Sequence, residues 1–344
     1  MVAPLNIPPR PTRHLMVRLP NWVGDVVMCL PALKHLSSLG MPLIICGRTW
    51  AKPLIQNIEK VEFVTLTGVF WHDLRSIRHA VKPNVVGLTF PDSLSSALLF
   101  RLAGVPTLGY RDDGRSWLLK WPVVKLTKPM HAVEKWFYLA DVGVKVWRDS
   151  LVLETSTADA FNGEELLVAL PPSIRISLNT TQVSKAQHLL KQAQIADQPY
   201  ILIAPTATGK HHGQVKIWPY FAALTQALQQ QGLTVVACPP QTERAQALQQ
   251  APTVQLLEPT DLGTFAALAQ GAKLVICNDS GVSHIAAAMG ANQITLFGVT
   301  DPKHSGPWSD LALCLGQQDE WPNLEQVLQA IKLKLNTSRT HIIS

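Results

Sequence analysis

Three segments of this chain bring chemically capable side chains to places where an apolar strand gives way to a helix. The first is RLPNWVGDVVMCLPAL, residues 18–33, in which a Pro-Asn turn follows the strand and Gly24 and Asp25 open the helix. Glycine lets a ligand approach the backbone closely, and a carboxylate at that point could act as a general base on a substrate hydroxyl. The alternative is structural, because aspartate is also favoured as a helix cap and complements the helix dipole.

The second segment, LVICNDSGVSHIAAAMG at 274–290, repeats the order of strand, turn and helix. Free N–H groups at a helix start, beside the small residues Ser280 and Gly281, form a cradle for phosphate. His284 follows one turn later and could reach a phosphate or ribose oxygen. The alternative is that Asp279 or Ser280 caps the helix and His284 only lines it. The small-residue context favours anion binding.

The third segment, APTATGKHHGQVKIWPYF at 204–221, is a long polar loop between a strand and a helix. Thr206 and Thr208 offer hydroxyl groups, and Lys210 and Lys216 offer cations to a diphosphate. The spacing differs from that of a Walker loop. A solvated basic loop is the alternative interpretation.

Several common site patterns are missing from the sequence. It has no DxD pair for a metal-bound nucleotide, because Asp112 and Asp113 are adjacent and would project differently, and it has no GxGxxG, HExxH or GxSxG motif. The five cysteines form no CxxC pair, and four lie in apolar runs, which predicts buried thiols rather than disulfides or a zinc site. The sequence therefore predicts no metal and no cofactor.

Composition places the chain among globular proteins. Of its 344 residues, 47% are hydrophobic and 16% are charged, which excludes global disorder. The proline-rich start has no apolar signal core, and no stretch approaches the roughly 18 apolar residues of a membrane span. We expect a cytoplasmic protein.

Charge is unevenly distributed between the two halves. Residues 1–155 carry 19 Lys and Arg against 11 Asp and Glu, whereas the remainder is slightly acidic. A basic half predicts an anionic partner. No nucleic-acid-binding signature accompanies the charge, so we expect no nucleic acid. An anionic lipid surface or a phosphorylated glycolipid fits, and scattered solubilising charge remains the alternative.

Apolar runs of strand length alternate with helix-like stretches, a pattern typical of α/β folds with parallel sheets. The predicted strands are 15–19, 42–47, 61–66, 85–90, 106–110, 200–205, 233–239, 254–259, 273–279 and 293–298. The predicted helices are 26–40, 93–104, 131–143, 218–232, 243–250, 262–271, 281–290 and 323–335.

The alternation indicates two doubly wound α/β domains that face each other across a cleft, since ligands bind beyond the carboxyl ends of such strands. The predicted organisation is an N-terminal extension (1–14), a first domain (15–160), a linker (161–180), a second domain (181–335) and a tail (336–344).

Taken together, these motifs resemble the bacterial ADP-heptose:lipopolysaccharide heptosyltransferases. The resemblance covers about residues 14–335 and is strongest at PNWVGD and at NDSGVSHIAAAMGANQITLFGVTDP, with the K-x-W-P turn between them. The Pro-x-Trp-x-Gly-Asp form is similar to the branch that adds the second heptose. The resemblance implies the GT-B architecture, with two Rossmann-like domains, and an inverting, metal-independent transfer from ADP-L-glycero-D-manno-heptose.

The same resemblance implies roles for individual residues. Asp25 would be the catalytic base, acting on an acceptor in the inner core of lipopolysaccharide. The implied donor contacts are Thr206, Thr208, Lys216, Asp279, Ser280, Gly281, Val282 and His284. The acceptor contacts we expect are Trp22, Arg48, Arg111 and Arg115. We further expect a monomer, bound peripherally to the anionic inner face of the inner membrane.

The sequence also departs from the family pattern. The acidic residue expected after the second strand of the C-terminal half falls in CPPQTER, where Glu243 is the candidate for contacting the adenosine ribose. The proline-rich extension has no counterpart. The alternatives are a heptosyltransferase acting on a protein or capsule precursor, a GT-B nucleotide-sugar epimerase, and an inactive nucleotide-sugar-binding protein. An epimerase would need several acids near the anomeric centre, and an inactive protein would have lost Asp25 or Lys216.

Overall fold

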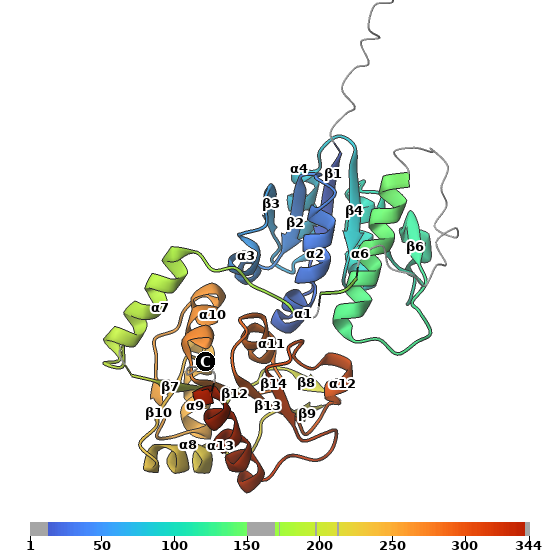
Figure 1. Cartoon of the computed structure of the whole chain (residues 1–344). Helices are drawn as coiled ribbons and strands as arrows, with labels where there is room; N and C mark the ends of the chain where they lie inside the picture. Colours follow the sequence, from blue (N-terminus) through green and yellow to red (C-terminus); the bar gives the residue numbers. More distant parts are fainter. Residues whose placement is uncertain (1–12, 150–168, 172, 197, 212, 341–344) are drawn as a thin grey trace, which may run out of the picture.

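The first sheet is built by apolar strands of the N-terminal half. A computed structural model describes residues 13–149, 169–171, 173–196, 198–211 and 213–340 (Figure 1). Six parallel strands pair in the order β3-β2-β1-β4-β5-β6. Their bounds are β1 (His14–Arg18), β2 (Leu43–Gly47), β3 (Val61–Thr65), β4 (Val85–Thr89), β5 (Thr107–Tyr110) and β6 (Trp121–Val123). Every residue of β2 and of β4 is buried, as continuous apolar runs predict for a sheet covered on both faces.

The second sheet repeats this arrangement in the C-terminal half. Its order is β11-β10-β7-β12-β13-β14, again with parallel pairing. The strands are β7 (Tyr200–Ala204), β10 (Thr234–Ala237), β11 (Gln255–Leu256), β12 (Leu274–Asn278), β13 (Gln293–Leu296) and β14 (Ala312–Leu315). A short antiparallel hairpin, β8 (Lys210–His211) with β9 (Gln214–Val215), extends from the loop after β7.

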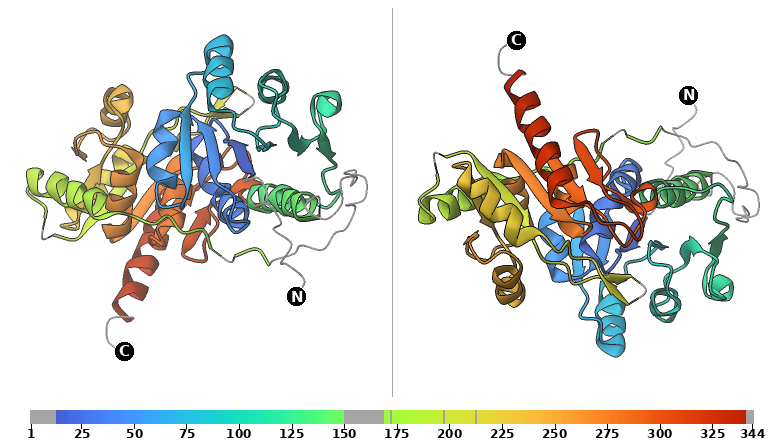
Figure 2. Two further views of the ribbon diagram at one scale, coloured as in Figure 1. Left: turned by 90° about the horizontal axis from the view of Figure 1, so that it is seen from above. Right: turned by 90° about the horizontal axis from the view of Figure 1, so that it is seen from below.

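Helices cover both faces of the first sheet (Figure 2). Buried residues of α2 and α6 belong to one hydrophobic cluster, and those of α4 and α5 to another on the opposite face. The elements here are α1 (Val23–Met28), α2 (Leu30–Ser37), η1 (Thr49–Ala51), α3 (Lys52–Ile55), α4 (Phe70–Ala80), α5 (Leu94–Leu102), η2 (Arg115–Leu118) and α6 (Ala132–Asp149).

The second sheet is likewise covered on both sides, by α8 and α13 on one face and by α10 and α11 on the other. The elements are α7 (Thr180–Gln192), α8 (Phe221–Gln230), η4 (Gln241–Glu243), α9 (Arg244–Gln250), α10 (Leu262–Gly271), α11 (Gly281–Ala288), α12 (Pro302–Ser305) and α13 (Leu324–Thr340). Both halves are therefore doubly wound, and the predicted α/β fold class is confirmed.

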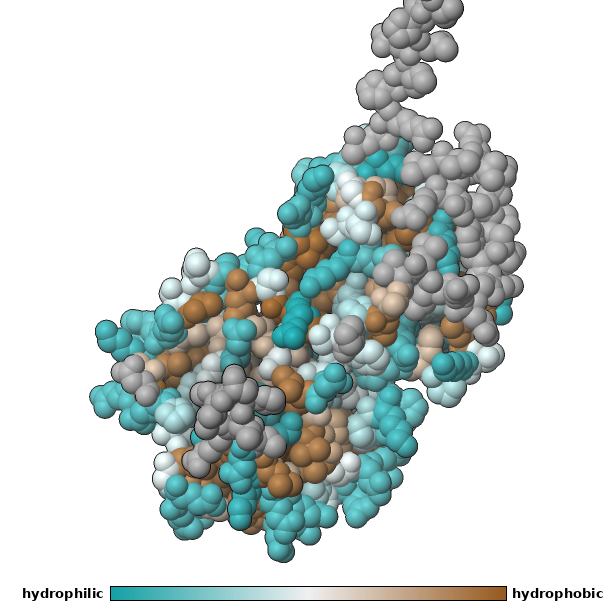
Figure 3. Space-filling view, in the orientation of Figure 1, coloured by the Kyte–Doolittle hydropathy of each residue, from teal (hydrophilic) through white to brown (hydrophobic). Residues whose placement is uncertain are grey.

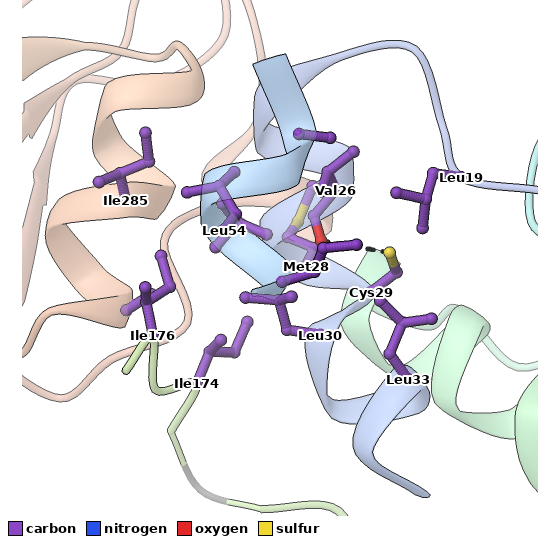
Figure 4. Packing of buried hydrophobic residues seen from close by; sticks show 14 of the residues in the cluster. Leu19, Val26, Met28, Cys29, Leu30, Leu33, Leu54, Ile174, Ile176 and Ile285 are labelled. Atoms are coloured by element: carbon purple, nitrogen blue, oxygen red, sulfur yellow. Dashed lines mark hydrogen bonds between the residues drawn. The ribbon is translucent and has the colours of Figure 1, made fainter. Parts of the chain in front are cut away.

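One hydrophobic cluster runs from the first sheet into the second. Figure 4 shows Leu54 of α3 between Ile285 of α11 and the side chains of Val26 and Met28 of α1, with Ile176 and Ile174 of the connecting segment below them. The connecting segment is also held by hydrogen bonds, since the Ile176 amide donates to the Ala288 carbonyl at 3.1 Å. The two sheets are thus packed together through a shared apolar core.

Several elements differ from the sequence-based prediction. The helix expected at 26–40 is two helices separated at Cys29, because Pro31 occupies the first turn of α2. The strand expected at 254–259 is reduced to Gln255–Leu256. The final helix continues to Thr340, past the tail boundary predicted at residue 336.

The elements that were not predicted include the helices α3, α4, α7 and α12, the strands β6 and β14, and the hairpin of β8 and β9. Of the predicted non-domain segments, residues 1–12 of the extension, 161–168 of the linker and 341–344 of the tail lie outside the described residues.

Hydrophilic side chains cover much of the outer rim of the face seen in Figure 3. No helix in the described part of the chain is long and apolar enough to cross a membrane.

Candidate active site

The catalytic candidate Asp25 lies in the first turn of α1, directly beyond the carboxyl end of β1. Trp22, not Asp25, occupies the N-cap position of α1, and it contributes no side-chain cap. Burial raises the pKa of Asp25 to about 6, and the nearby Lys216 ammonium partly opposes that rise. A carboxylate with a pKa close to neutrality is well matched to general-base chemistry.

Lys216 follows the β8–β9 hairpin and enters the site from the second domain. Its Nζ donates to Oδ2 of Asp279 at 2.8 Å, and the hydroxyl of Thr300 donates to the same oxygen at 2.6 Å. Asp279 is buried and follows β12. Asp279 therefore positions Lys216, and its own carboxylate is already occupied by two donors.

The helix α11 begins immediately after Asp279. Ser280 is its N-cap, and the Ser280 hydroxyl accepts from the Val282 amide at 3.4 Å, so the capping interpretation of Ser280 is correct. Gly281 and Val282 form the first turn, where backbone N–H groups point out of the helix end. This end also carries the positive pole of the helix dipole, which attracts anions.

His284 lies one turn into α11 and is buried. Burial lowers its pKa to about 4, so the imidazole is neutral at pH 7. Its Nδ1 is buried without a hydrogen-bond partner among the described residues. A buried polar atom without a partner at this position indicates a place where a ligand atom can complete the bonding.

The two helices that carry these residues touch at their N-terminal ends, at a pair of glycines. A Cβ added at Gly24 would lie 2.6 Å from Cδ2 of His284, and one added at Gly281 would lie 2.6 Å from Cβ of Val23. Side chains cannot occupy those positions without a shift, so α1 approaches α11 this closely only because both residues are glycine. This contact brings Asp25 of the first domain to Lys216 and α11 of the second.

The loop after β7 contributes the two predicted hydroxyl residues. Thr206 is buried, and its hydroxyl donates to Oε2 of Glu243 at 2.5 Å, whereas Thr208 is exposed. The structure therefore brings Glu243 directly to the loop that carries Thr206. Glu243 is the residue of CPPQTER that we considered for contact with the adenosine ribose.

The expected acceptor residues are separated by the structure. Trp22 is 62% exposed beside Asp25, and Arg48 follows β2 with its guanidinium packed against Gly68. Arg111 is exposed on the loop after β5.

Arg115 differs from the other three, because it has no exposed surface. Its guanidinium donates to the carbonyls of Asp112 and Pro91, at 3.1 and 2.8 Å, and to Oδ1 of Asp92 at 3.0 Å. The structure thus uses Arg115 to hold the 111–118 loop and does not present it to the cleft, in disagreement with the expected acceptor contact.

Sequence reasoning missed Arg18, the last residue of β1. It is buried, its Nη2 donates to Oδ1 of Asn21 at 2.8 Å, and its Nε has no partner among the described residues. Burial lowers the pKa of the Arg18 guanidinium, and the like charge of nearby Arg48 adds to that lowering. The signal available in the sequence was an arginine at the end of an otherwise apolar strand, directly before the PNWVGD turn.

Within the described residues, no group of three or more His, Cys, Asp or Glu side chains is arranged to hold a metal ion. The site instead places a carboxylate of raised pKa opposite an ammonium and a helix N-terminus. Such an arrangement can remove a proton from a hydroxyl while it stabilises a departing diphosphate.

Comparison with known proteins identifies the family. Residues 74–335 match glycosyltransferase family 9 (heptosyltransferase). The chain belongs to this family. It is therefore a glycosyltransferase, as the resemblance of its motifs to the heptosyltransferases implied.

Relatives and solved structures agree with this assignment. The family 9 chain is 25% identical over 320 residues to lipopolysaccharide heptosyltransferase 2 of Escherichia coli K12, covering 87% of this chain and 86% of the relative. It is 26% identical over 328 residues to lipooligosaccharide heptosyltransferase 2 of Haemophilus influenzae, covering 87% of each chain.

The structure of E. coli ADP-heptose lps heptosyltransferase II superposes with a TM-score of 0.72 at 23% identity, covering 95% of this chain and 99% of that one. The structure of E. coli heptosyltransferase WaaC with ADP superposes with a TM-score of 0.67 at 21% sequence identity, and the match covers 94% of this chain and 99% of that one. The family 9 enzyme thus has the GT-B fold.

Proposed function

We propose that this glycosyltransferase transfers a heptose from ADP-L-glycero-D-manno-heptose to the inner core of lipopolysaccharide, by a metal-independent reaction that inverts the anomeric configuration. The observation that carries the proposal is the meeting of Asp25, Lys216 and the start of α11 at the contact between the two domains. The named activities of the E. coli and H. influenzae relatives support the donor and acceptor classes.

The reaction is a single displacement. The Asp25 carboxylate takes the proton from an acceptor hydroxyl, whose oxygen forms a bond to the anomeric carbon of the heptose. The bond from that carbon to the diphosphate oxygen breaks, and ADP leaves with the electron pair. Attack from the side opposite ADP inverts the configuration, and the raised pKa of Asp25 suits it to accept the proton.

Residues of the second domain stabilise the leaving group. Negative charge grows on the diphosphate as the bond breaks, and Lys216 together with the amides of Ser280 and Gly281 meets that charge at fixed positions. Asp279 keeps Lys216 in place. His284, neutral at pH 7 and with an unpartnered Nδ1, can donate or accept one hydrogen bond to the donor.

Nucleoside and acceptor contacts follow from the remaining residues. Thr206 and Thr208 lie on the loop that faces the donor, and Glu243 beside Thr206 fits the ribose hydroxyls. On the other side of the cleft, Arg18 and Arg48 offer cationic groups to the acidic sugars and phosphates of the inner core. The enzyme acts as a monomer that is bound peripherally at the inner face of the inner membrane.

The decisive experiment incubates the protein with ADP-heptose and a panel of truncated lipopolysaccharide cores, then weighs the products and determines the anomeric configuration by NMR. A core heavier by one heptose, of inverted configuration and formed equally in EDTA, is the expected result. Transfer only to a protein or capsule precursor would change the acceptor class. An epimerised donor without transfer would overturn the transferase reaction, and EDTA-sensitive transfer restored by magnesium would overturn metal independence.

A further inference from the structure

The helices α4 and α5 lie side by side on one face of the first sheet, away from α2 and α6 (Figure 2). Their inner residues, including Leu74 and Phe100, pack in one hydrophobic cluster. The pair is also joined at its far end, where the Arg78 guanidinium donates to the Leu102 carbonyl at 3.0 Å. The two helices therefore present one continuous outer surface, which we call the α4–α5 face and define as the exposed residues of 69–80 and 94–102.

The α4–α5 face carries positive charge and no exposed acid. Its charged residues are Arg75, Arg78 and Arg101, with His72 and His79 between them. The single acid in either helix, Asp73, is buried and accepts hydrogen bonds from the Thr67 amide and hydroxyl and from the Gly68 amide. The face is thus complementary to a negatively charged partner.

The same face exposes large apolar side chains at one end. Trp71 is 73% exposed and Val69 61%, and both are at the N-terminal end of α4. Leu94, the first residue of α5, is also exposed, and Trp117 of the adjoining η2 is as exposed as Trp71. These residues all follow the carboxyl ends of strands, so they lie at the sheet edge where β1 ends and Asp25 follows.

Exposed tryptophan beside arginine is the pattern of surfaces that sit at a lipid–water interface. Indole rings favour the headgroup level, and each nearby arginine is attracted by anionic lipid. Interfaces with folded proteins are depleted of charged residues at their centre, whereas here cations are spread along both helices. The chemistry therefore favours a lipid surface over a protein.

We propose that the α4–α5 face docks this enzyme on an anionic bilayer, with Trp71 entering the headgroup layer and Arg75, Arg78 and Arg101 contacting lipid phosphates. The inference rests on the proposed function in one respect, since a glycolipid acceptor is what brings the enzyme to a membrane. The charge and the exposed apolar residues of the α4–α5 face do not depend on that function.

The test is flotation of the full-length protein with vesicles of phosphatidylcholine, with and without phosphatidylglycerol, at low and high salt. The probe variant is Trp71→Ser with Arg75→Gln, two exposed residues outside the catalytic site. The matched control is Leu248→Ser with Lys332→Gln, which removes one exposed apolar residue and one cation from the second domain.

Wild-type protein should float only with vesicles that contain phosphatidylglycerol, and high salt should release it because the Debye length falls from ~10 Å at 0.1 M to ~3 Å at 1 M. The affinity of the probe variant for these vesicles should fall by at least about tenfold. One arginine alone contributes roughly fivefold, and the loss of the indole adds to it. The control should float like the wild type, and ADP binding should be the same in all three proteins.

Equal flotation of the probe variant and the wild type would overturn the proposal, as would an equal loss in the control. Flotation that ignores phosphatidylglycerol or salt would also overturn it. The catalytic proposal is tested separately, by transfer to a short water-soluble acceptor that needs no membrane. Loss of the predicted transfer alongside the expected flotation pattern would therefore count against the function and leave the docking face standing.

Discussion

Lys216 and Asp279 form a 2.8 Å ion pair in which both groups are largely shielded from water. The pair holds the lysine ammonium at the start of α11, where the dipole also attracts anions. A diphosphate that arrives there meets a cation whose position is already fixed, so little ordering cost remains to be met on binding.

Replacing Lys216 with alanine should therefore weaken the binding of ADP by ~1.5–3 kcal/mol, the scale of a hydrogen bond to a charged group. Adenosine, which has no phosphate, should bind almost unchanged. Isothermal titration calorimetry with both ligands measures the difference. Lys273→Ala is the control and should bind ADP normally, because Lys273 lies directly before β12, at the end of the strand opposite to Asp279. An equal loss for ADP and adenosine would remove Lys216 from the phosphate site.

Asp25→Asn should reduce turnover by about 10²–10⁴, the range of general-base catalysis, while donor binding persists. The wild-type rate should rise with pH through about 6, because the carboxylate must be ionised to accept the proton and its pKa is raised to about 6. The pH–rate profile of the variant should lack that limb. Unchanged turnover in Asp25→Asn would leave Asp25 with only a structural role at the start of α1.

Asp25 and His284 should also affect stability in opposite directions over the same pH range. The pKa of Asp25 is raised from 3.8 to about 6 on folding, so the folded state binds more protons there and loses stability as pH rises through that window. The pKa of His284 is lowered from 6.5 to about 4, so the folded state binds fewer protons and gains stability as pH rises. The two contributions largely cancel.

Asp25→Asn removes the contribution of Asp25 to the pH dependence of stability and leaves that of His284. The variant should be more stable than the wild type at neutral pH by roughly 1–3 kcal/mol, the size of a shift of about two pKa units. It should then lose stability more steeply than the wild type toward acid, because only the His284 contribution remains. Urea denaturation at neutral and mildly acidic pH measures both effects. Parallel pH dependence in the two proteins would contradict the cancellation.

Gly24→Ala tests the contact between the domains. The added methyl would lie 2.6 Å from Cδ2 of His284, so either the buried His284 ring or α1 itself must shift. A displacement of about 1 Å in such a site can cost ~10² in rate, and we expect a loss of that order in kcat. The matched experiment is a double-mutant cycle with His284→Ala, which removes the clashing ring. The glycine substitution should cost much less in that background, and equal costs in both would show that the clash is not the cause.

Alanine substitutions at Arg115 and Arg111 compare a buried and an exposed arginine on the same loop. Arg115→Ala removes a fully buried guanidinium and takes away the donor that the Pro91 and Asp112 carbonyls share, while the half-exposed Asp92 keeps its ion pair with Lys125, so the free energy of unfolding should fall by about 1–3 kcal/mol. Arg111→Ala, at an exposed position on the same loop, should change stability by less than ~0.5 kcal/mol. Thermal unfolding of the two variants makes the comparison. Similar melting temperatures would contradict the structural role of Arg115.

Much of the fold could be predicted from the sequence because the central strands are continuous apolar runs. Residues 43–47, 85–89 and 274–278 are buried at every position, and such runs are visible without an alignment. Strand β14 was missed because its residues are only half buried. The helix α4 was missed because Trp71, Arg75 and Arg78 on its outer face obscure the apolar stripe that packs inward.

The site was predictable residue by residue but not as an arrangement. Asp25 and His284 could each be found from the strand–turn–helix order around them. Their proximity depends on Gly24 and Gly281, whose small size matters only after the two domains have packed. Arg115 shows the opposite difficulty, since a sequence does not distinguish an arginine that faces a ligand from one enclosed by carbonyls.

The glycine contact between α1 and α11 joins two groups that the proposed mechanism requires to act together. The proposed base Asp25 belongs to the first domain and the proposed diphosphate contacts belong to the second, so on that mechanism neither domain alone holds a complete reaction centre. If the two domains separate to admit a donor or release ADP, the base moves out of reach of the anomeric carbon. On the proposed mechanism, water that enters such an open enzyme would find no base in reach, so the nucleotide sugar would survive until the two domains close around an acceptor.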